Sequence, residues 1–185
     1  SYSQRIYELL RGVVYDGKTY GYKRIDLDDL RYMLGLYRTD KNGHERSIYP
    51  AYSNLKQRVL EPSVNEINLQ SDIQVRYSEI KKGKKVIALN FSVLLKSETN
   101  EPWIRFMLWE PMDIACKLAE IAQKRNRHIV VAEELVKYSH VSLAKLIYGI
   151  QEEIIDLHEI HNCQAFFEYK LRVYDGQETE KETTE

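Results

Sequence analysis

The pattern of apolar and polar positions is clearest between Tyr52 and Asn68, where it has the period of a helix. At 100° per residue, apolar side chains fall in one half of this helix and a polar arc of about 100° lies on the other. The arc holds amides and an arginine, whose paired donors and acceptors can match base edges in the major groove of DNA. This helix alone is equally consistent with an ordinary solvated face. The apolar half comprises Leu55, Val59, Leu60, Ser63, Val64 and Ile67, and the polar arc comprises Asn54, Gln57, Arg58, Glu61, Asn65 and Asn68.

Two segments that follow this helix alternate with a period of two, which predicts β-strands. Apolar residues occupy every second position from 73 to 77 and again from 87 to 93. Gly83 lies between the two strands and supplies the positive φ of a tight turn. Four lysines surround Gly83, and such a cluster suits a phosphate backbone, although lysine-rich turns also serve solubility. These lysines are Lys81, Lys82, Lys84 and Lys85.

Upstream, the sequence predicts the remaining parts of a helix-turn-helix. A first helix ends near Gly12, and a short strand from about 20 to 25 leads to Asp26, an expected N-cap. The second helix stops near Gly35, and residues 38–47 are expected to form a loop. The expected buried residues of these helices are Tyr2, Ile6, Leu9 and Leu10, then Leu27, Leu30, Met33 and Leu34. The order helix, strand, helix, loop, helix, strand, basic turn, strand is that of a winged helix-turn-helix.

The second half of the chain has a less definite pattern. After a polar linker at 96–101, the aromatic segment Trp103–Trp109 is expected to dock on the winged helix. The docking face lies opposite the recognition helix, which is the helix predicted at 52–68. Helices are predicted at about 112–124, 131–138 and 142–157, and a strand at about 165–174, because aromatic and charged residues alternate there. The predicted buried residues of the helices are Ile114, Leu118, Ile121, Leu143, Leu146, Ile147, Ile150 and Ile154.

The fold class is therefore α+β: a winged helix-turn-helix followed by a small helical or α+β C-terminal part. The predicted domains are residues 1–95, which bind DNA, and residues 96–176, whose role the sequence does not indicate. Residues 177–185 are acidic, lack hydrophobic side chains and are expected to be a disordered tail.

Residues 2–93 resemble the C-terminal winged-helix domain of the iteron-binding Rep proteins, the plasmid replication initiators that bind directly repeated origin sequences. The resemblance as a whole covers about half of the chain. Four segments carry it in this order and spacing: 2–10, 25–30, 55–68 and 79–85. Such initiators usually have a further winged helix that serves dimerisation, so the chain is expected to be a fragment that begins at the interdomain junction.

The resemblance places the base-reading residues at the start of the recognition helix. Gln57 departs from the run of arginines common there, and because glutamine can bind adenine bidentately, the recognised sequence should differ. Pro62 fits the family and is expected to bend the helix without ending it. The predicted base contacts are Asn54, Gln57, Arg58, Glu61 and Asn65. The predicted DNA backbone contacts are Ser53, Lys56, Lys81, Lys82, Lys84 and Lys85.

The charge distribution agrees with a DNA-binding first half. Residues 1–95 carry 16 basic and 11 acidic side chains, a net charge of +5, whereas residues 96–185 carry 11 and 17, a net charge of −6. The overall net charge of −1 conceals this difference. The first half can therefore attract DNA, and the second half would repel DNA or mask the basic surface.

Composition and motifs exclude several other classes. No apolar run approaches the ~20 residues of a membrane span, and two cysteines without a leader indicate a reducing cytoplasm. No glycine-rich phosphate loop is present. His158, His161 and Cys163 could bind a metal, but Cys116, His128 and His140 lack ligand spacing, so histidines at a helix end are the favoured interpretation. We predict no metal, no cofactor and no enzyme activity.

Three functions remain, and the sequence favours the first. It is binding of double-stranded DNA at origin repeats by a replication initiator; the second is a winged-helix transcriptional repressor, which can be the same protein acting on its own promoter. The third is an enzyme acting on bound DNA. The resemblance further implies a homodimer formed through the missing N-terminal domain, and recruitment of the host initiator and helicase.

Overall fold

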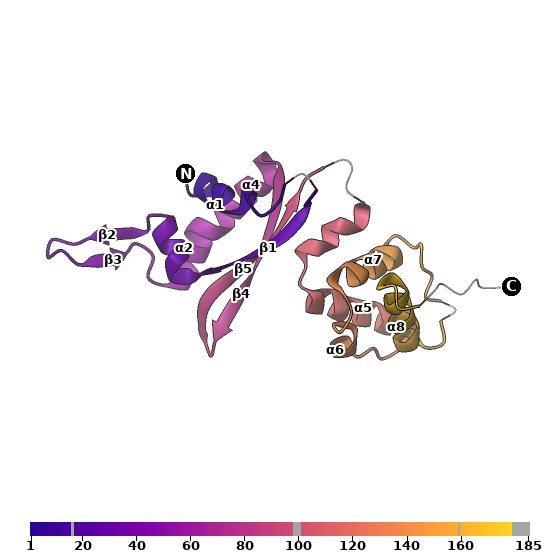
Figure 1. Ribbon diagram of the computed structural model, residues 1–185. Coiled ribbons are helices and arrows are strands. Elements are labelled where there is room, and N and C mark those ends of the chain that lie inside the picture. The colour runs from indigo at the N-terminus through magenta and orange to yellow at the C-terminus, as the bar shows by residue number, and fades with distance from the viewer. Residues whose placement is uncertain (16, 98–100, 159, 179–185) are drawn as a thin grey trace. The chain divides into compact units, whose positions relative to one another are not determined.

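The structure, a computed structural model, describes residues 1–15, 17–97, 101–158 and 160–178. It divides into two compact units, residues 1–100 and 101–185, each of which is described by itself (Figure 1). The first unit contains α1 (Tyr2–Arg11), β1 (Tyr20–Asp26), α2 (Leu27–Met33), β2 (Tyr37–Thr39), β3 (Glu45–Ser47), α3 (Tyr52–Leu55), a π-helical turn (Lys56–Leu60), α4 (Glu61–Gln70), β4 (Ile73–Lys82) and β5 (Lys85–Leu95). The second contains a 3₁₀ helix (Pro102–Leu108), α5 (Pro111–Asn126), α6 (Ala132–Leu135), α7 (His140–Gln151) and α8 (Cys163–Tyr174).

The main sheet of the first unit has three antiparallel strands in the order β1-β5-β4. The central strand β5 pairs Leu94 with Tyr20 on one side and Val93 with Val75 on the other. The period-two pattern of residues 73–77 and 87–93 thus predicted the strands correctly. Because β5 is bonded on both edges, it fixes the position of the whole β4–β5 hairpin.

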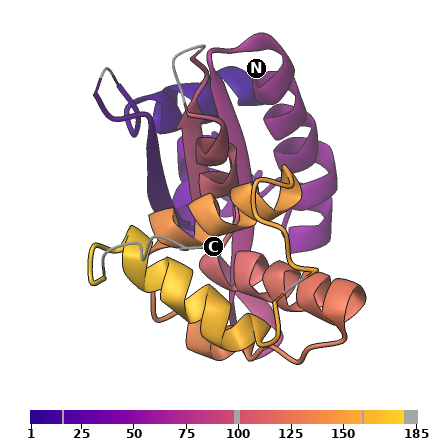
Figure 2. The same cartoon turned by 90° about the vertical axis from the view of Figure 1, so that its right-hand side faces the viewer.

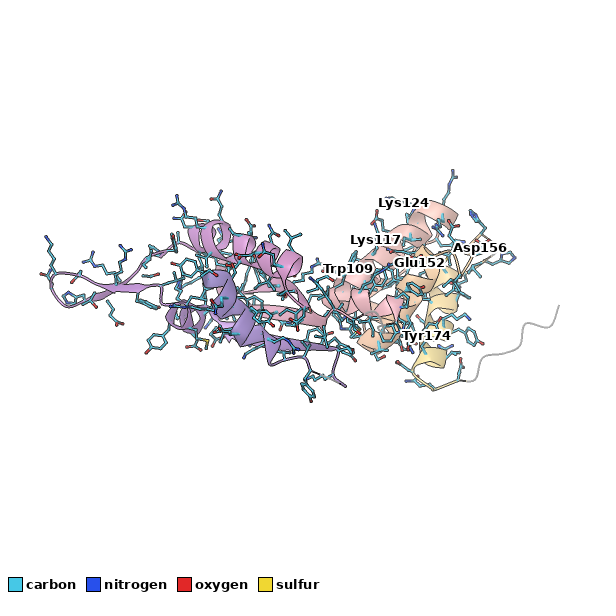
Figure 3. All side chains as sticks on the ribbon, turned by 90° about the horizontal axis from the view of Figure 1, so that it is seen from above. Trp109, Lys117, Lys124, Glu152, Asp156 and Tyr174 are labelled. Carbon is cyan, nitrogen blue, oxygen red and sulfur yellow. The ribbon has the colours of Figure 1, made fainter. Side chains whose placement is uncertain are left out.

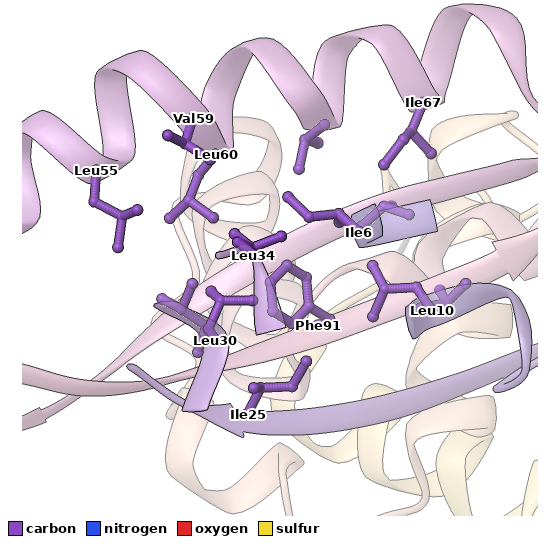
Figure 4. Close-up of a cluster of buried hydrophobic side chains, with 14 of the residues drawn as sticks. Ile6, Leu10, Ile25, Leu30, Leu34, Leu55, Val59, Leu60, Ile67 and Phe91 are labelled. Carbon is purple, nitrogen blue, oxygen red and sulfur yellow. The ribbon is translucent and has the colours of Figure 1, made fainter. Parts of the chain in front are cut away.

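The core of the first unit lies between this sheet and the helices (Figure 4). Phe91 points from β5 into the centre of the cluster and is fully buried. The apolar half of the helix predicted at 52–68 is buried at all six positions, which confirms its orientation: Leu55, Val59, Leu60, Ser63, Val64 and Ile67. Helix α1 contributes Ile6 and Leu10, and α2 contributes Leu27 and Leu30.

Helix α1 is attached to the start of β4 by polar contacts as well as by packing. The hydroxyl of Tyr7 donates to Asp72 at 2.9 Å, and Arg11 Nε donates to the same carboxylate at 2.8 Å. Together the two donors outweigh the cost of partial burial and lower the pKa of Asp72. The loop between α4 and β4 is thereby fixed to α1.

Two sequence predictions in the first unit were wrong. Met33 is exposed, because α2 ends at this residue and its buried stripe is continued by Leu34 and Leu36 instead. The predicted loop at 38–47 is a small antiparallel hairpin, β2–β3, in which Arg38 pairs with Arg46. Its strands of three residues carry no apolar alternation, so the sequence pattern did not reveal them.

All regular secondary structure among the described residues of the second unit is helical, and the predicted strand at 165–174 is wrong. That segment is the helix α8, which runs beside α7 (Figure 2). Asn162 caps it by accepting a hydrogen bond from the Ala165 N–H at 3.1 Å. Cys163, Phe167 and Leu171 are buried with the i, i+4 spacing of a helix face.

Two further helices of the second unit are shorter than predicted. Helix α6 spans only Ala132–Leu135, and α7 ends at Gln151 because Glu153 adopts a left-handed φ of 57°. Ile154 is therefore exposed and not in the core. Leu143, Leu146, Ile147 and Ile150 are buried as predicted.

The aromatic segment after the linker forms the 3₁₀ helix Pro102–Leu108, which packs against α7 within its own unit. Arg105 donates to Glu152 at 2.6 Å and stacks over the rings of Phe106 and Tyr148. Docking of this segment onto the first unit stays a prediction. Residues 98–100 of the expected linker and 179–185 of the expected tail lie outside the described residues.

Candidate nucleic-acid interface

The predicted recognition helix is continuous from Tyr52 to Gln70, but it contains a π-helical turn at Lys56–Leu60. Within this turn the Glu61 N–H bonds to the carbonyl of Lys56, five residues back. Pro62 follows directly; it has no N–H, and its ring clashes with the carbonyl four residues back in a regular α-helix. The wider π turn accommodates the proline, so the helix continues through it as predicted.

The π turn shows that the spacing of 100° per residue assumed for the recognition helix does not hold at Lys56–Leu60. Gln57 and Arg58 lie inside it, so each turn there takes more residues and their side chains are rotated relative to those of α4. Both are nevertheless exposed. The other predicted base-reading residues, Asn54, Glu61 and Asn65, are also exposed on the same continuous helix. Their contact with bases stays a prediction.

Arg58 lies on the flank of the helix that is nearest to α1. It lines an open hollow together with Arg5, Gly35 and Pro62. Arg5 is held there because its guanidinium donates to the carbonyl of Leu34 at 2.7 Å. Two guanidinium groups therefore face one hollow beside the recognition helix, which favours a negatively charged ligand at this flank.

Asn68 has a structural role that the helical wheel did not reveal. Its side-chain oxygen accepts from the Val75 N–H at 2.6 Å, and its amide nitrogen donates to the Val75 carbonyl at 2.9 Å. The amide therefore completes the outer edge of β4 as a further strand residue would. Asn68 ties the end of the recognition helix to the wing, which is the β4–β5 hairpin, and its amide is not available to a base edge.

Glu79 on β4 links the start of the recognition helix to the wing. Its carboxylate accepts from the Tyr52 hydroxyl at 2.9 Å and from Lys56 Nζ at 2.9 Å, and Lys81 Nζ lies 3.1 Å away. The hydrogen bond from Lys56, with those from Tyr52 and Lys81, lowers the pKa of Glu79 to about 2 despite partial burial. Burial and the same carboxylate raise the pKa of Tyr52.

This arrangement changes the interpretation of Lys56, which we predicted to contact phosphate. Its ammonium is half-exposed and bonded to Glu79. An ammonium has three donors, so Lys56 can keep this bond and still donate to a phosphate. Glu79 thus holds Lys56 in place, and the contact itself stays a prediction.

We expect Glu79→Gln to lower the free energy of unfolding by about 1–3 kcal/mol at neutral pH, since it removes charge-assisted hydrogen bonds. The folded-state pKa of about 2 lies below the ordinary value of 4.5, so the carboxylate stabilises the fold above pH 4.5 and loses this contribution as the pH falls toward 2. The difference between the two proteins, measured by urea denaturation, should therefore shrink below pH 4.5 and be mostly lost near pH 2. Glu61→Gln, on the exposed helix face, is the control, and stability curves for Glu79→Gln and wild type that stay parallel down to pH 2 would contradict the assignment.

The wing tip has the geometry that the sequence predicted. Lys82 pairs with Lys85 across a two-residue turn, and Gly83 has a φ of 62°. A positive φ at the first turn residue is that of the type II′ hairpin turns, which favour glycine. A register shift between Ile80 and Lys81 interrupts the ladder just before the tip and increases its twist. Lys81, Lys82, Lys84 and Lys85 are all exposed.

Ser53 is exposed in the first turn of α3, where backbone N–H groups are not yet paired within the helix. The structure thus gathers Ser53, Lys56 and the wing lysines on the first unit, at two places joined by Glu79. The exposure of these residues is compatible with DNA contacts, and the contacts themselves stay predictions.

Other chemistry is less supported by the described residues. Among them, no three side chains of the types His, Cys, Asp and Glu gather closely enough to hold a metal ion. His128 Nδ1 lies 3.3 Å from the Sγ of Cys163, a contact that the sequence spacing did not indicate. Within the described ranges, no helix combines the length and apolar character needed to cross a membrane.

The comparisons with known proteins agree with this geometry. Residues 26–93 match the family model of the initiator Rep protein, WH2. This stretch of the chain is therefore similar to a winged-helix domain of initiator Rep proteins. The match confirms the resemblance seen in the sequence and covers α2, the recognition helix and the wing.

A solved structure, the Pi initiator protein in complex with iteron DNA, is also similar. It is 29% identical, the match covers 52% of this chain and 39% of that chain, and the TM-score is 0.49. This chain thus spans about two fifths of the length of that initiator. No curated protein matches the chain.

Proposed function

We propose that this chain binds double-stranded DNA at directly repeated origin sequences and thereby serves the initiation of plasmid replication. The observation that carries the proposal is the match of the recognition helix and the lysine-tipped wing to an initiator Rep winged helix. The net charge of +5 on residues 1–95 supports it, because cationic surfaces attract the phosphate backbone.

In the proposed complex, the helix of α3, the π turn and α4 lies in the major groove. Asn54, Gln57, Arg58, Glu61 and Asn65 face base edges, and the amide of Gln57 is suited to adenine. Ser53, Lys56 and the wing lysines contact phosphates on either side of the groove. Binding along successive repeats would strain the neighbouring duplex, which is the step that opens an origin.

The proposed partners beyond DNA are a second copy of the protein, the host initiator and the replicative helicase. They rest on the family assignment alone. The proposal assigns binding and not catalysis to this chain, and it requires neither metal nor cofactor. The proposed location is the cytoplasm, where a plasmid replicates.

Selection of bound duplexes from a random pool tests the proposal. A preferred sequence that occurs as direct repeats in a plasmid origin would support it. A preferred inverted repeat at a promoter would instead indicate a repressor, and cleavage of the selected DNA would indicate an enzyme. Failure to enrich any sequence would overturn the assignment.

We expect Gln57→Ala and Arg58→Ala each to weaken binding to the selected site by about 1–3 kcal/mol and to relax the choice of base at one or two positions. Binding to random duplexes should change little, because lysines supply most of that affinity. The exposed Gln70→Ala, at the far end of the same helix, is the control. Equal losses on selected and random DNA would show that these two residues touch only phosphate.

A further inference from the structure

The β2–β3 hairpin projects from the first unit, and the proposed interface gives it no role. It lies in the chain between α2 and the recognition helix, and it extends away from the body of the unit in a different direction from the β4–β5 wing (Figure 1). An isolated two-stranded hairpin is marginally stable in water. Other contacts must therefore hold the β2–β3 hairpin in its ordered shape.

The base of the hairpin is closed by a backbone hydrogen bond, and a side chain of α2 bonds to the segment that follows it. The Ile48 N–H bonds to the Leu36 carbonyl at 2.9 Å, and Leu36 is fully buried. The guanidinium of Arg31 on α2, which is itself almost buried, donates to the Pro50 carbonyl at 3.1 Å, just before α3 begins. The direction of the hairpin is thus fixed relative to the recognition helix.

The tip of the hairpin is also preorganised. The Asp40 carboxylate accepts from the backbone N–H groups of Asn42 at 2.8 Å and of His44 at 3.0 Å. Gly43 takes a φ of 83°, and the Asp40 N–H bonds to the His44 carbonyl at 2.8 Å. An aspartate turn of this kind holds a loop in one shape without a hydrophobic core.

The two faces of the hairpin differ in charge. Arg38 and Arg46 are directly paired, so their side chains lie on the same face, whereas Thr39 and Glu45 lie on the other. Like charges directly opposite one another destabilise a β-ladder. Asp40 offsets only part of this repulsion, since it lies 3.1 Å from Arg46 and is also shared with His44. The face therefore has an excess of positive charge that a bound anion would neutralise.

We propose that the β2–β3 hairpin is a second DNA-backbone clamp, in which Arg38 and Arg46 grip phosphates that flank the stretch read by the recognition helix. The inference rests on the proposed DNA-binding function. Guanidinium groups bind phosphate bidentately, and a two-stranded ribbon can follow a DNA groove. At about 3.4 Å per residue the hairpin extends about 13 Å from its base, which corresponds to about four base pairs of duplex.

The test uses the whole chain and a duplex with one copy of the sequence selected from the random pool. Arg38→Gln/Arg46→Gln should weaken binding about tenfold near 0.15 M salt. The negative slope of log K against log salt should become shallower by about 2, because each phosphate contact contributes about −0.9. Hydroxyl-radical protection should disappear from one flank of the site and stay at its centre. Thr39→Gln, on the other face of the same hairpin, should leave affinity, slope and footprint unchanged.

Two further measurements distinguish a DNA-backbone contact from other roles of the hairpin: the melting temperature of the variant, and its binding to a duplex with two copies of the site. Removing a like-charge pair should leave the melting temperature unchanged or raise it, so a loss of binding that accompanies unfolding would count against the clamp. Unchanged slope and footprint would overturn the inference while the proposed function stands. The inference would also be overturned if the variant bound one copy normally but lost cooperativity on two adjacent copies. That result would show that the hairpin contacts a neighbouring protein molecule and not the DNA backbone. If the wild-type chain selected no duplex at all, the proposed function itself would fail.

Discussion

Replacing Lys82, Lys84 and Lys85 by alanine is expected to weaken binding to selected and random duplexes alike, by about a hundredfold at low salt. Lysine is a point charge without a base code, so the loss should not depend on sequence. Three lost phosphate contacts should make the negative slope of log K against log salt shallower by about 2.7. The exposure of these residues on a turn fixed by Gly83 means that the substitutions remove charge without disturbing the core.

The matched control removes the same charge from the second unit. Lys117 and Lys124 lie along α5, where both bind Glu120, and Lys137 binds Glu134 (Figure 3). Alanine at these three positions should change affinity and salt slope little. The measurement is fluorescence anisotropy of a labelled duplex at several salt concentrations. A wing variant with the wild-type salt slope would show that the wing does not touch the backbone.

Most of the winged helix could be predicted from the sequence because its helices and the strands of its main sheet pack against the core. The recognition helix shows this well: five apolar residues and Ser63 fixed its orientation before its partners were known, and all six are buried. The β4–β5 hairpin was equally accessible, since alternation sets the strands and Gly83 sets the turn. An element that packs one face against a core has apolar residues at regular spacing in its sequence.

The α8 segment shows where a periodic pattern gives the wrong prediction. Aromatic and charged residues alternate from Phe166 to Val173, and β-branched and aromatic residues are frequent in strands. The same segment also has the i, i+4 spacing of a helix face at Cys163, Phe167 and Leu171, and Asn162 is a suitable N-cap. Packing against α7 decides between the two patterns, and that information is not local to the segment.

The parts of the interface that the sequence did not reveal depend on contacts between distant residues. Glu79 is separated from Lys56 by 23 positions, and nothing in either neighbourhood indicates that they meet. The amide of Asn68 looked like a base-reading group and is instead bonded to the backbone of β4. The β2–β3 hairpin has no hydrophobic alternation, because neither of its faces is covered by the core. A helical wheel can assign a residue to the polar side of a helix, but it cannot distinguish a free polar group from a paired one.

Phe91→Ala is expected to lower the free energy of unfolding of the first unit by about 3–5 kcal/mol, which is a large share of the stability of an ordinary domain. Phe91 is fully buried on the central strand and its ring lies 5.8 Å from that of Tyr77. Truncation leaves a cavity in the middle of the core that the paired strand β5 cannot collapse to fill. Leu69→Ala is the control, since this leucine is 82% exposed on α4 and should change stability by less than about 0.5 kcal/mol.

The two tryptophans, Trp103 and Trp109, both belong to the second unit, which lets the same experiment separate the units. In urea, circular dichroism reports the unfolding of both units, whereas tryptophan fluorescence reports the second. If the 3₁₀ helix docks on the winged helix as predicted, Phe91→Ala should shift the fluorescence transition together with the loss of β-structure, because unfolding the first unit exposes the docked surface. If the units fold independently, only the dichroism transition should move. A dichroism transition that stays in place would contradict the position of Phe91 in the core, whereas a fluorescence transition that stays in place would contradict docking alone.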